Sequence, residues 1–217
     1  MYKKIHIDRL FPCPPSKNYD NLMIDYRSIY HISLPSDTIV ITAIIESHIP
    51  KNLSMDSLNI LDCTACVGGD TISFGKMFGT VVATEIEPNK YNMLSNNVKE
   101  FELYNVVTIN DDCIKILNRL NFIDIVYFDP PWGGRNYKEK KDIRLSIGDI
   151  YIDDLINIVF DGKKMRSDVK MVVLKLPKNY NLYELYKNTK HNDVIMYLHE
   201  MAKMYIVVFK KTRFVDS

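Results

Sequence analysis

The sequence predicts an α/β protein with a doubly wound, mostly parallel sheet of seven strands that ends in an antiparallel hairpin. From residue 58 onward, short apolar runs alternate with helix-like segments, which is typical of a parallel sheet built from βαβ units. The runs are nearly continuous in apolar residues, as expected where helices cover both faces of the sheet. Acidic residues and glycines follow several runs, at the sheet edge where such folds bind ligands.

Length and composition are those of one globular domain. The chain has 217 residues, of which 47% are hydrophobic and 25% charged. We expect residues 1–50 to form an N-terminal extension that contributes to the substrate or cofactor site, and residues 51–217 to form the core domain. The net charge of +1 provides no global field for steering nucleic acid, so any nucleic-acid site must be local.

The predicted helices and strands follow from the spacing of apolar residues and from the prolines and capping residues that mark where an element begins or ends. Residues 1–30 show no period and are expected to be irregular, and a helix then begins at Ser36 or Asp37 and ends before Pro50. Pro88 fits the first turn of a later helix. The predicted strands are 58–62, 80–85, 106–109, 123–128 and 169–176, with a hairpin at 193–199 and 203–210. The predicted helices are 70–78, 88–103, a segment after Asp112, and 150–160.

The cysteines and the apolar runs bear on other classes of protein. Cys63 and Cys66 have the CxxC spacing of a redox or zinc pair, but no second CxxC and no histidine pair accompanies them. We therefore interpret them as small buried side chains and expect no metal. No apolar run approaches the roughly 20 residues of a membrane span, so we expect no membrane partner.

Three acidic residues follow three successive predicted strands. Asp62 precedes a loop with Gly68 and Gly69, Glu85 ends the second strand, and Asp112 follows the third. Glu85 can accept hydrogen bonds from ribose hydroxyls and Asp112 from an adenine amino group. The G-x-G-x-x-G spacing of dinucleotide sites is absent. The trio therefore favours S-adenosylmethionine, which has a ribose, an adenine and a positive centre but no phosphate.

The run Asp129-Pro130-Pro131-Trp132 follows the fourth predicted strand and indicates the chemistry. It resembles the D/N/S-P-P-aromatic motif of amino-methyltransferases. An exocyclic amine on a base is a poor nucleophile, and acceptors at Asp129 and the Pro130 carbonyl favour its tetrahedral, reactive form in the transition state. Pro130 and Pro131 stiffen the loop, and Trp132 can stack on the base. We expect all four residues to be catalytic.

The longer run from Phe128 to Tyr137, FDPPWGGRNY, resembles trimethylguanosine synthases. Residues 59–70, 85–88 and 174–177 extend this resemblance. It implies a class I methyltransferase fold, Rossmann-like, and methyl transfer to N2 of a 7-methylguanosine cap on RNA. Two positions depart from the family pattern, because Cys66 replaces a glycine and Asp129 stands where many eukaryotic members have serine.

The resemblance also implies roles for particular residues. Trp132 stacks on the methylated guanine, Asp62 and Glu85 hold the cofactor, and Ser33 contributes to the site. The expected cofactor-binding residues are Asp62, Thr64, Cys66, Gly68, Glu85, Ile86, Asp112, Cys113 and Asp129. The expected substrate-binding residues are Trp132, Ser33, Arg135 and Tyr137.

Other functions stay open at this point. The enzyme could instead modify N6 of adenine or N2 of guanine within RNA or DNA, or an amine on a protein or small molecule. A catalytically silent subunit that stimulates a partner is a further alternative. The Lys- and Asn-rich, Gly-poor composition is typical of an AT-rich viral or parasitic genome. We expect a monomer in the cytoplasm or nucleus, or in the host-cell cytoplasm for a viral protein.

Overall fold

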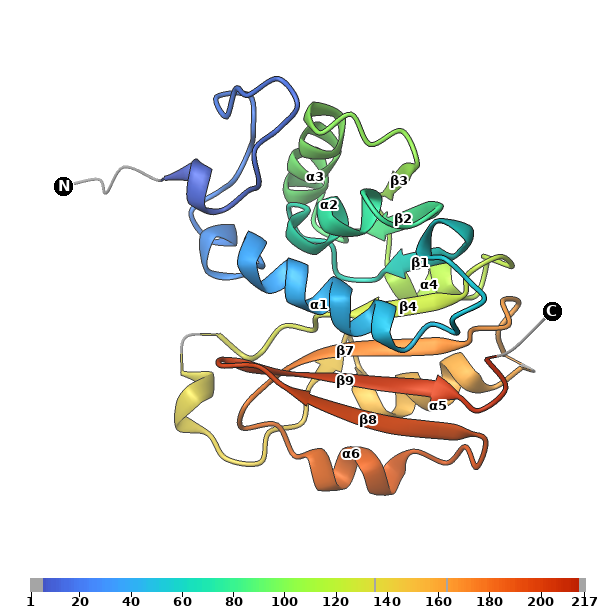
Figure 1. Cartoon of the computed structure of the whole chain (residues 1–217). Helices are drawn as coiled ribbons and strands as arrows, with labels where there is room; N and C mark the ends of the chain where they lie inside the picture. The colour runs from blue at the N-terminus through green and yellow to red at the C-terminus, as the bar shows by residue number, and fades with distance from the viewer. Residues whose placement is uncertain (1–5, 135, 163, 215–217) are drawn as a thin grey trace.

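A seven-stranded sheet forms the centre of the molecule in the computed structural model, which describes residues 6–134, 136–162 and 164–214. The strand order is β3-β2-β1-β4-β7-β9-β8 (Figure 1). Its strands are β1 (Asn59–Asp62), β2 (Thr80–Thr84), β3 (Val106–Ile109), β4 (Ile125–Phe128), β7 (Met171–Pro177), β8 (Val194–Glu200) and β9 (Met204–Lys211). The first five strands in this order run parallel, and β9 is antiparallel to both β7 and β8. The predicted fold class is therefore confirmed.

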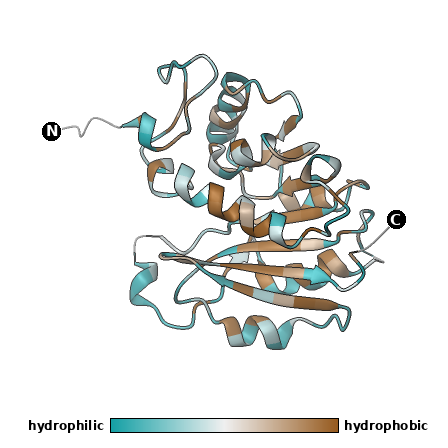
Figure 2. Ribbon diagram, viewed as in Figure 1, coloured by the Kyte–Doolittle hydropathy of each residue, from teal (hydrophilic) through white to brown (hydrophobic). Residues whose placement is uncertain are grey.

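Helices cover both faces of the sheet. The α-helices are α1 (Pro35–Ser47), α2 (Gly69–Gly75), α3 (Pro88–Glu100), α4 (Cys113–Leu117), α5 (Ile152–Phe160) and α6 (Leu182–Asn188). Side chains of α1 and α2 pack on one face of β1, β2, β4, β7 and β9, and α3 joins them over Ala83. Side chains of α4, α5 and α6 pack on the other face. Figure 2 shows hydrophobic residues concentrated on the strands between these two layers.

The strands read as apolar because burial on both faces removes the usual alternation. All four residues of β4 and all seven of β7 are buried. Successive side chains point to opposite faces, so Val173 packs toward α1 and α2 while Leu174 packs toward α5. Lys175 breaks this apolar pattern inside β7 and is only 4% exposed.

The segment before α1 packs across the edge of the core. It is irregular apart from the short 3-10 turns Ile7–Arg9 and Ser28–Tyr30. Its Phe11, Leu22 and Ile32 are buried in a cluster with residues of α2 and the end of α3. Asn97 of α3 also ties this segment down, because its side chain exchanges hydrogen bonds with the Met23 backbone. These contacts carry the segment to the sheet edge that bears the predicted site.

Two short strands and one short helix were not predicted, and several bounds differ by a few residues. Ile150–Tyr151 forms β6, which pairs with β5 (Ser146–Ile147), so the helix predicted from residue 150 begins at Ile152. The seven-residue α6 follows β7, with the Asn181 side chain accepting from the Glu184 N–H as its N-cap. Met55–Ser57 and Tyr137–Glu139 are 3-10 turns.

Candidate active site

The carboxyl ends of the parallel strands open into a cavity of about 1860 Å³. Small-molecule sites are usually about 300–1,000 Å³, so this cavity has room for two ligands side by side. Most residues that the sequence predicts for the site line it: Ser33, Thr64, Cys66, Glu85, Ile86, Asp112, Cys113, Asp129, Pro130, Pro131, Trp132 and Tyr137. Asp62 and Gly68 are not among the lining residues, and Arg135 lies outside the described residues.

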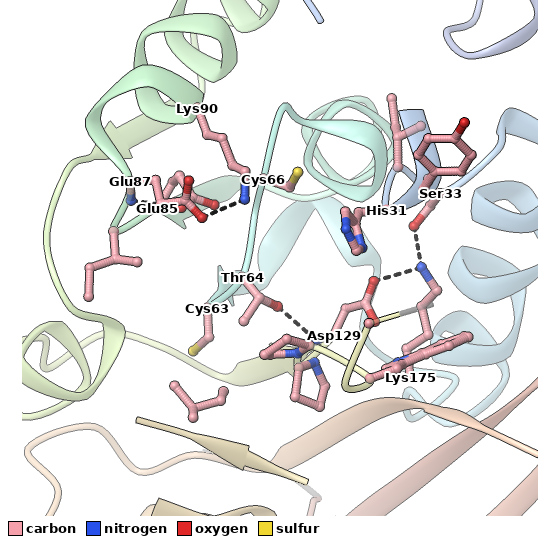
Figure 3. A pocket seen from close by; sticks show the side chains of 18 of the residues that line it. His31, Ser33, Cys63, Thr64, Cys66, Glu85, Glu87, Lys90, Asp129 and Lys175 are labelled. Carbon is pink, nitrogen blue, oxygen red and sulfur yellow. Dashed lines mark hydrogen bonds and ion pairs between the residues drawn. The ribbon is translucent and has the colours of Figure 1, made fainter. Parts of the chain in front are cut away.

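Glu85 lies just after β2 on one side of the cavity (Figure 3). Its Oε1 accepts a hydrogen bond of 2.8 Å from the Glu87 N–H, which fixes the carboxylate. Burial raises the pKa of Glu85, against the opposing effect of that backbone hydrogen bond. The next charges along the chain pair with each other, since Lys90 Nζ lies 2.6 Å from Glu87 Oε1. Glu85 thus presents an ordered acceptor to the cavity.

Asp112 combines a structural role with a place on the cavity wall. Its Oδ1 accepts a 2.9 Å hydrogen bond from the Ile114 N–H, so it is the N-cap of α4. One oxygen of Asp112 therefore serves as a helix cap. A carboxylate has a second oxygen with which to accept from a ligand.

Asp62 lies behind the loop that follows β1 and is 1% exposed. Its two oxygens accept from the Thr71 hydroxyl at 2.6 Å and from the Thr64 N–H at 3.2 Å. Burial raises its pKa to about 7. The Thr64 hydroxyl in turn accepts a 2.7 Å hydrogen bond from the Asp129 N–H. Asp62 therefore holds the loop that bears Thr64, and Thr64 holds the start of the run from Asp129 to Trp132.

Cys66 and Gly68 both have left-handed backbone conformations, with φ of +51° and +102°. Such φ values favour glycine, which explains why the family pattern has glycine where this chain has Cys66. The Cys66 thiol donates to Ser28 Oγ at 3.6 Å, and burial raises its pKa to about 11. Cys63 and Cys66 are free thiols, and the described part of the chain contains no group of three or more potential metal ligands.

The run from Asp129 to Trp132 directly follows β4 and lines the cavity. Pro130 is buried, and the Trp132 ring lies edge-on to the Tyr137 ring at 5.3 Å and 70°. Gly133 and Gly134 have φ of +93° and +80°, so they turn the chain back between the two aromatic residues. Trp132 and Tyr137 therefore lie together in the lining of the cavity.

A polar cluster that was not predicted surrounds the Asp129 carboxylate, and Figure 3 shows Lys175 between Asp129 and Ser33. Lys175 of β7 donates to Asp129 Oδ2 at 2.7 Å and to Ser33 Oγ at 2.5 Å. Ser33 and Tyr127 then donate to Asp70 Oδ2 at 2.5 and 3.1 Å. A lysine inside an otherwise apolar buried strand was the signal in the sequence that could have revealed this cluster.

The cluster sets the charge of Asp129. Burial raises the pKa of Asp129 to about 6, although the Lys175 ammonium beside it opposes that rise. Burial alone would lower the pKa of Lys175, but the carboxylates of Asp129 and Asp70 raise it above its usual value. At neutral pH the site therefore holds an ionised acceptor next to an ammonium.

The lining residues fit S-adenosylmethionine. Glu85 and Asp112 offer carboxylate acceptors at two successive strand ends, suited to ribose hydroxyls and an adenine amino group. Asp129 and the other buried carboxylates suit a positive sulfonium. No helix among the described residues is long and apolar enough to cross a membrane.

Comparison with known proteins agrees with this geometry. The family model described as RNA cap guanine-N2 methyltransferase matches residues 56–212. An uncharacterized protein, L320, of Acanthamoeba polyphaga mimivirus is 32% identical over 93% of this chain and 84% of its own length. The trimethylguanosine synthase of Schizosaccharomyces pombe is 26% identical over 76% of this chain and 67% of its own length.

A solved structure supports the fold. The precorrin-6y C5,15-methyltransferase of Geobacter metallireducens superposes with a TM-score of 0.61 at 15% identity, over 88% of this chain and 95% of that one. At this identity the likeness concerns the arrangement of the sheet and its helices.

Proposed function

This chain belongs to the RNA cap guanine-N2 methyltransferase family, and from that membership we propose that it methylates the exocyclic N2 of a 7-methylguanosine cap on RNA. It is a class I methyltransferase, and S-adenosylmethionine is its cofactor. The mimiviral relative supports a viral source and action in the host-cell cytoplasm.

One observation carries the proposal. The Asp129–Trp132 run lies in the same cavity as Glu85 and Asp112, so a cofactor acceptor set and an amine-binding motif share one space. The volume of about 1860 Å³ accommodates a nucleoside cofactor and a purine acceptor together. A silent subunit would have no need for both features.

Asp129, Pro130 and Thr64 have different roles in the proposed methyl transfer. When bound, S-adenosylmethionine supplies an electrophilic methyl group. Asp129 and the Pro130 carbonyl accept the amine hydrogens, which localises the nitrogen lone pair as the transition state forms. The backbone hydrogen bond from Asp129 to Thr64 keeps these acceptors in place before the substrate arrives.

Aromatic and basic residues in the lining of the cavity support recognition of a charged cap. A 7-methylguanine is cationic, and an indole such as Trp132 binds a cationic ring more strongly than a neutral one. Lys138, Lys178 and Lys203 also line the cavity, where they can attract the phosphates of a cap. This local basic wall agrees with a chain whose net charge is only +1.

A methylation panel tests the proposal. The protein is incubated with labelled S-adenosylmethionine and 7-methylguanosine cap analogue, unmethylated cap analogue, uncapped RNA or DNA, and the methylated nucleoside is identified. We expect label on N2 of 7-methylguanosine, and no label with Asp129→Ala. Label on an internal base would establish the internal methyltransferase reading in its place. Absence of any label, with the cofactor bound, would favour the silent subunit.

A further inference from the structure

Lys175 is buried, and burying its ammonium is unfavourable unless charged or polar partners compensate for the lost hydration. It is 4% exposed in the middle of β7, between buried leucines at positions 174 and 176. Removing an ammonium from water costs several kcal/mol, which is recovered only through close charged or polar partners. Its partners come from three different parts of the chain: the segment before α1, the end of β4, and α2.

The distances identify Asp129 as the principal partner. Lys175 Nζ lies 2.7 Å from Asp129 Oδ2 but 3.7 Å from Asp70 Oδ2, which it reaches through Ser33 Oγ. Asp129 lines the cavity and keeps 18% of its side chain exposed there, whereas Asp70 is buried and is not on the cavity wall. The ammonium therefore bears on the one carboxylate that faces the acceptor.

We propose that Lys175 is a positioning residue for methyl transfer, which holds the Asp129 carboxylate ionised and in one orientation against the acceptor amine. This inference rests on the proposed function, in which Asp129 grips that amine. Lys175 donates to Oδ2 alone, so the carboxylate keeps acceptor capacity for the amine hydrogen.

Charge balance explains why Asp129 needs this neighbour. The groups that face the pair are Asp70 of α2, Asp62 of β1, Tyr127 of β4 and Asp37 of α1. The carboxyl groups of Asp70, Asp62 and Asp37 therefore all act on the pair, and Lys175 supplies the ammonium that balances them. Without it, Asp129 would take up a proton at neutral pH, because burial and like charges disfavour the ionised form. A protonated Asp129 is a poorer acceptor for an amine hydrogen.

The pH profile of kcat tests the proposal. In Lys175→Met we expect the acidic limb to move upward by about two pH units, with about a tenfold loss of kcat at pH 7 that is recovered at high pH. Lys175→Arg should restore the wild-type limb. The matched control is Lys170→Met, because Lys170 pairs with the exposed Asp168, far from the cavity wall, and Lys211 pairs with that same carboxylate. An equal loss of kcat at every pH, with the limb unmoved, would overturn the proposal and leave Lys175 a purely structural residue.

A second measurement needs no substrate. Carbon-13 NMR of aspartate carboxyl groups, with Asp129→Asn to assign the signal, should show Asp129 titrating at higher pH in Lys175→Met than in the wild type. An unchanged titration contradicts the role of Lys175 even if the enzyme methylates caps. Conversely, if the wild-type protein methylates none of the acceptors, the proposed function is wrong. The NMR titration still tests whether Lys175 keeps Asp129 ionised, because it needs no substrate. If Lys175→Met does not fold, Lys175→Gln keeps the hydrogen bonds without the charge and serves the same test.

Discussion

Glu85 is the residue whose predicted role is most directly measurable. Its carboxylate is fixed by the Glu87 N–H and lines the cavity. We expect Glu85→Ala to weaken S-adenosylmethionine binding by about 1.5–3 kcal/mol, since a hydrogen bond to a charged acceptor is lost. Calorimetry measures this loss, with the exposed Glu46→Ala as control. Equal affinity in Glu85→Ala and the wild type would remove Glu85 from the ribose site.

Asp62 gives the molecule a pH-dependent stability. Burial raises its pKa from 3.8 to about 7 in the folded state, so the folded state binds this proton more tightly than the unfolded state. Its contribution to stability is therefore fully present below about pH 4 and is lost as the pH rises through about 7, by up to about 4 kcal/mol.

We expect Asp62→Asn to reduce the difference in unfolding free energy between about pH 5 and pH 8. Urea denaturation at the two pH values measures it, with exposed Asp20→Asn as the matched control. If Asp62→Asn and Asp20→Asn change the pH dependence equally, Asp62 is ionised in the folded protein throughout this range and the argument fails.

Single residues also show where sequence reasoning stops. Acids after strands marked the correct edge of the sheet, yet Asp62 turns both oxygens toward Thr64 and Thr71 instead of the cavity. That direction depends on the packing of α2, which spacing along the chain does not reveal. The partners of Lys175 are likewise 46 and 142 residues away, so no local pattern could have named them.

Among the elements, the loop from Asp129 to Tyr137 is the one on which the proposed substrate choice can be tested, because Asp129, Trp132 and Tyr137 line the cavity. If Trp132 stacks on a cationic 7-methylguanine, the methylated cap should bind about 5-fold to 30-fold more tightly than the unmethylated one. Trp132→Ala should weaken both and erase most of the difference, whereas Trp132→Phe should retain part of it. Fluorescence titration with both caps measures these ratios. Discrimination that survives in Trp132→Ala would assign recognition to another aromatic residue, of which Tyr137 is the nearest.

The helices and strands that the sequence predicts correctly are those with long apolar runs or with a residue such as proline that marks their start. The helix that begins with Pro88 and the apolar strands β4 and β7 belong to this group. The two-residue strands β5 and β6 have no periodicity to detect, and α6 spans only seven residues. Such short elements are stabilised by tertiary contacts, as when Leu185 of α6 packs in the core beside α5, and propensity alone does not predict them.

For the whole molecule, the arrangement of the sheet was predictable because strand and helix alternate along the chain. The expected contribution of residues 1–50 to the site stays a prediction, and the contacts that hold this segment in place, such as that between Met23 and Asn97, join residues far apart in the sequence. The predicted division at residue 50 stays a prediction, although Ile41 and Ile45 of α1 are completely buried in the core.

Cofactor binding should stabilise the fold as a unit. A ligand at 100 times its Kd that binds only the folded state adds about 2.7 kcal/mol. For a chain of this length we expect the melting temperature to rise by about 5–10 °C with S-adenosylmethionine. Thermal melting measures the shift, and S-adenosylmethionine should stabilise Trp132→Ala equally. No shift at saturating cofactor would show that the cavity does not bind it.

The bond between Ser33 and Lys175 also bears on the order of folding. The two residues are 142 positions apart, so the link closes a very long loop. During synthesis Ser33 leaves the ribosome before any strand of the sheet. Its hydrogen bond with Lys175 can form only after β7 has been synthesised. Asp129 acquires its ammonium neighbour at the same late moment. The proposed catalytic centre is therefore completed late, from contacts of high sequence separation, and a nascent chain that has not yet reached β7 has no complete site.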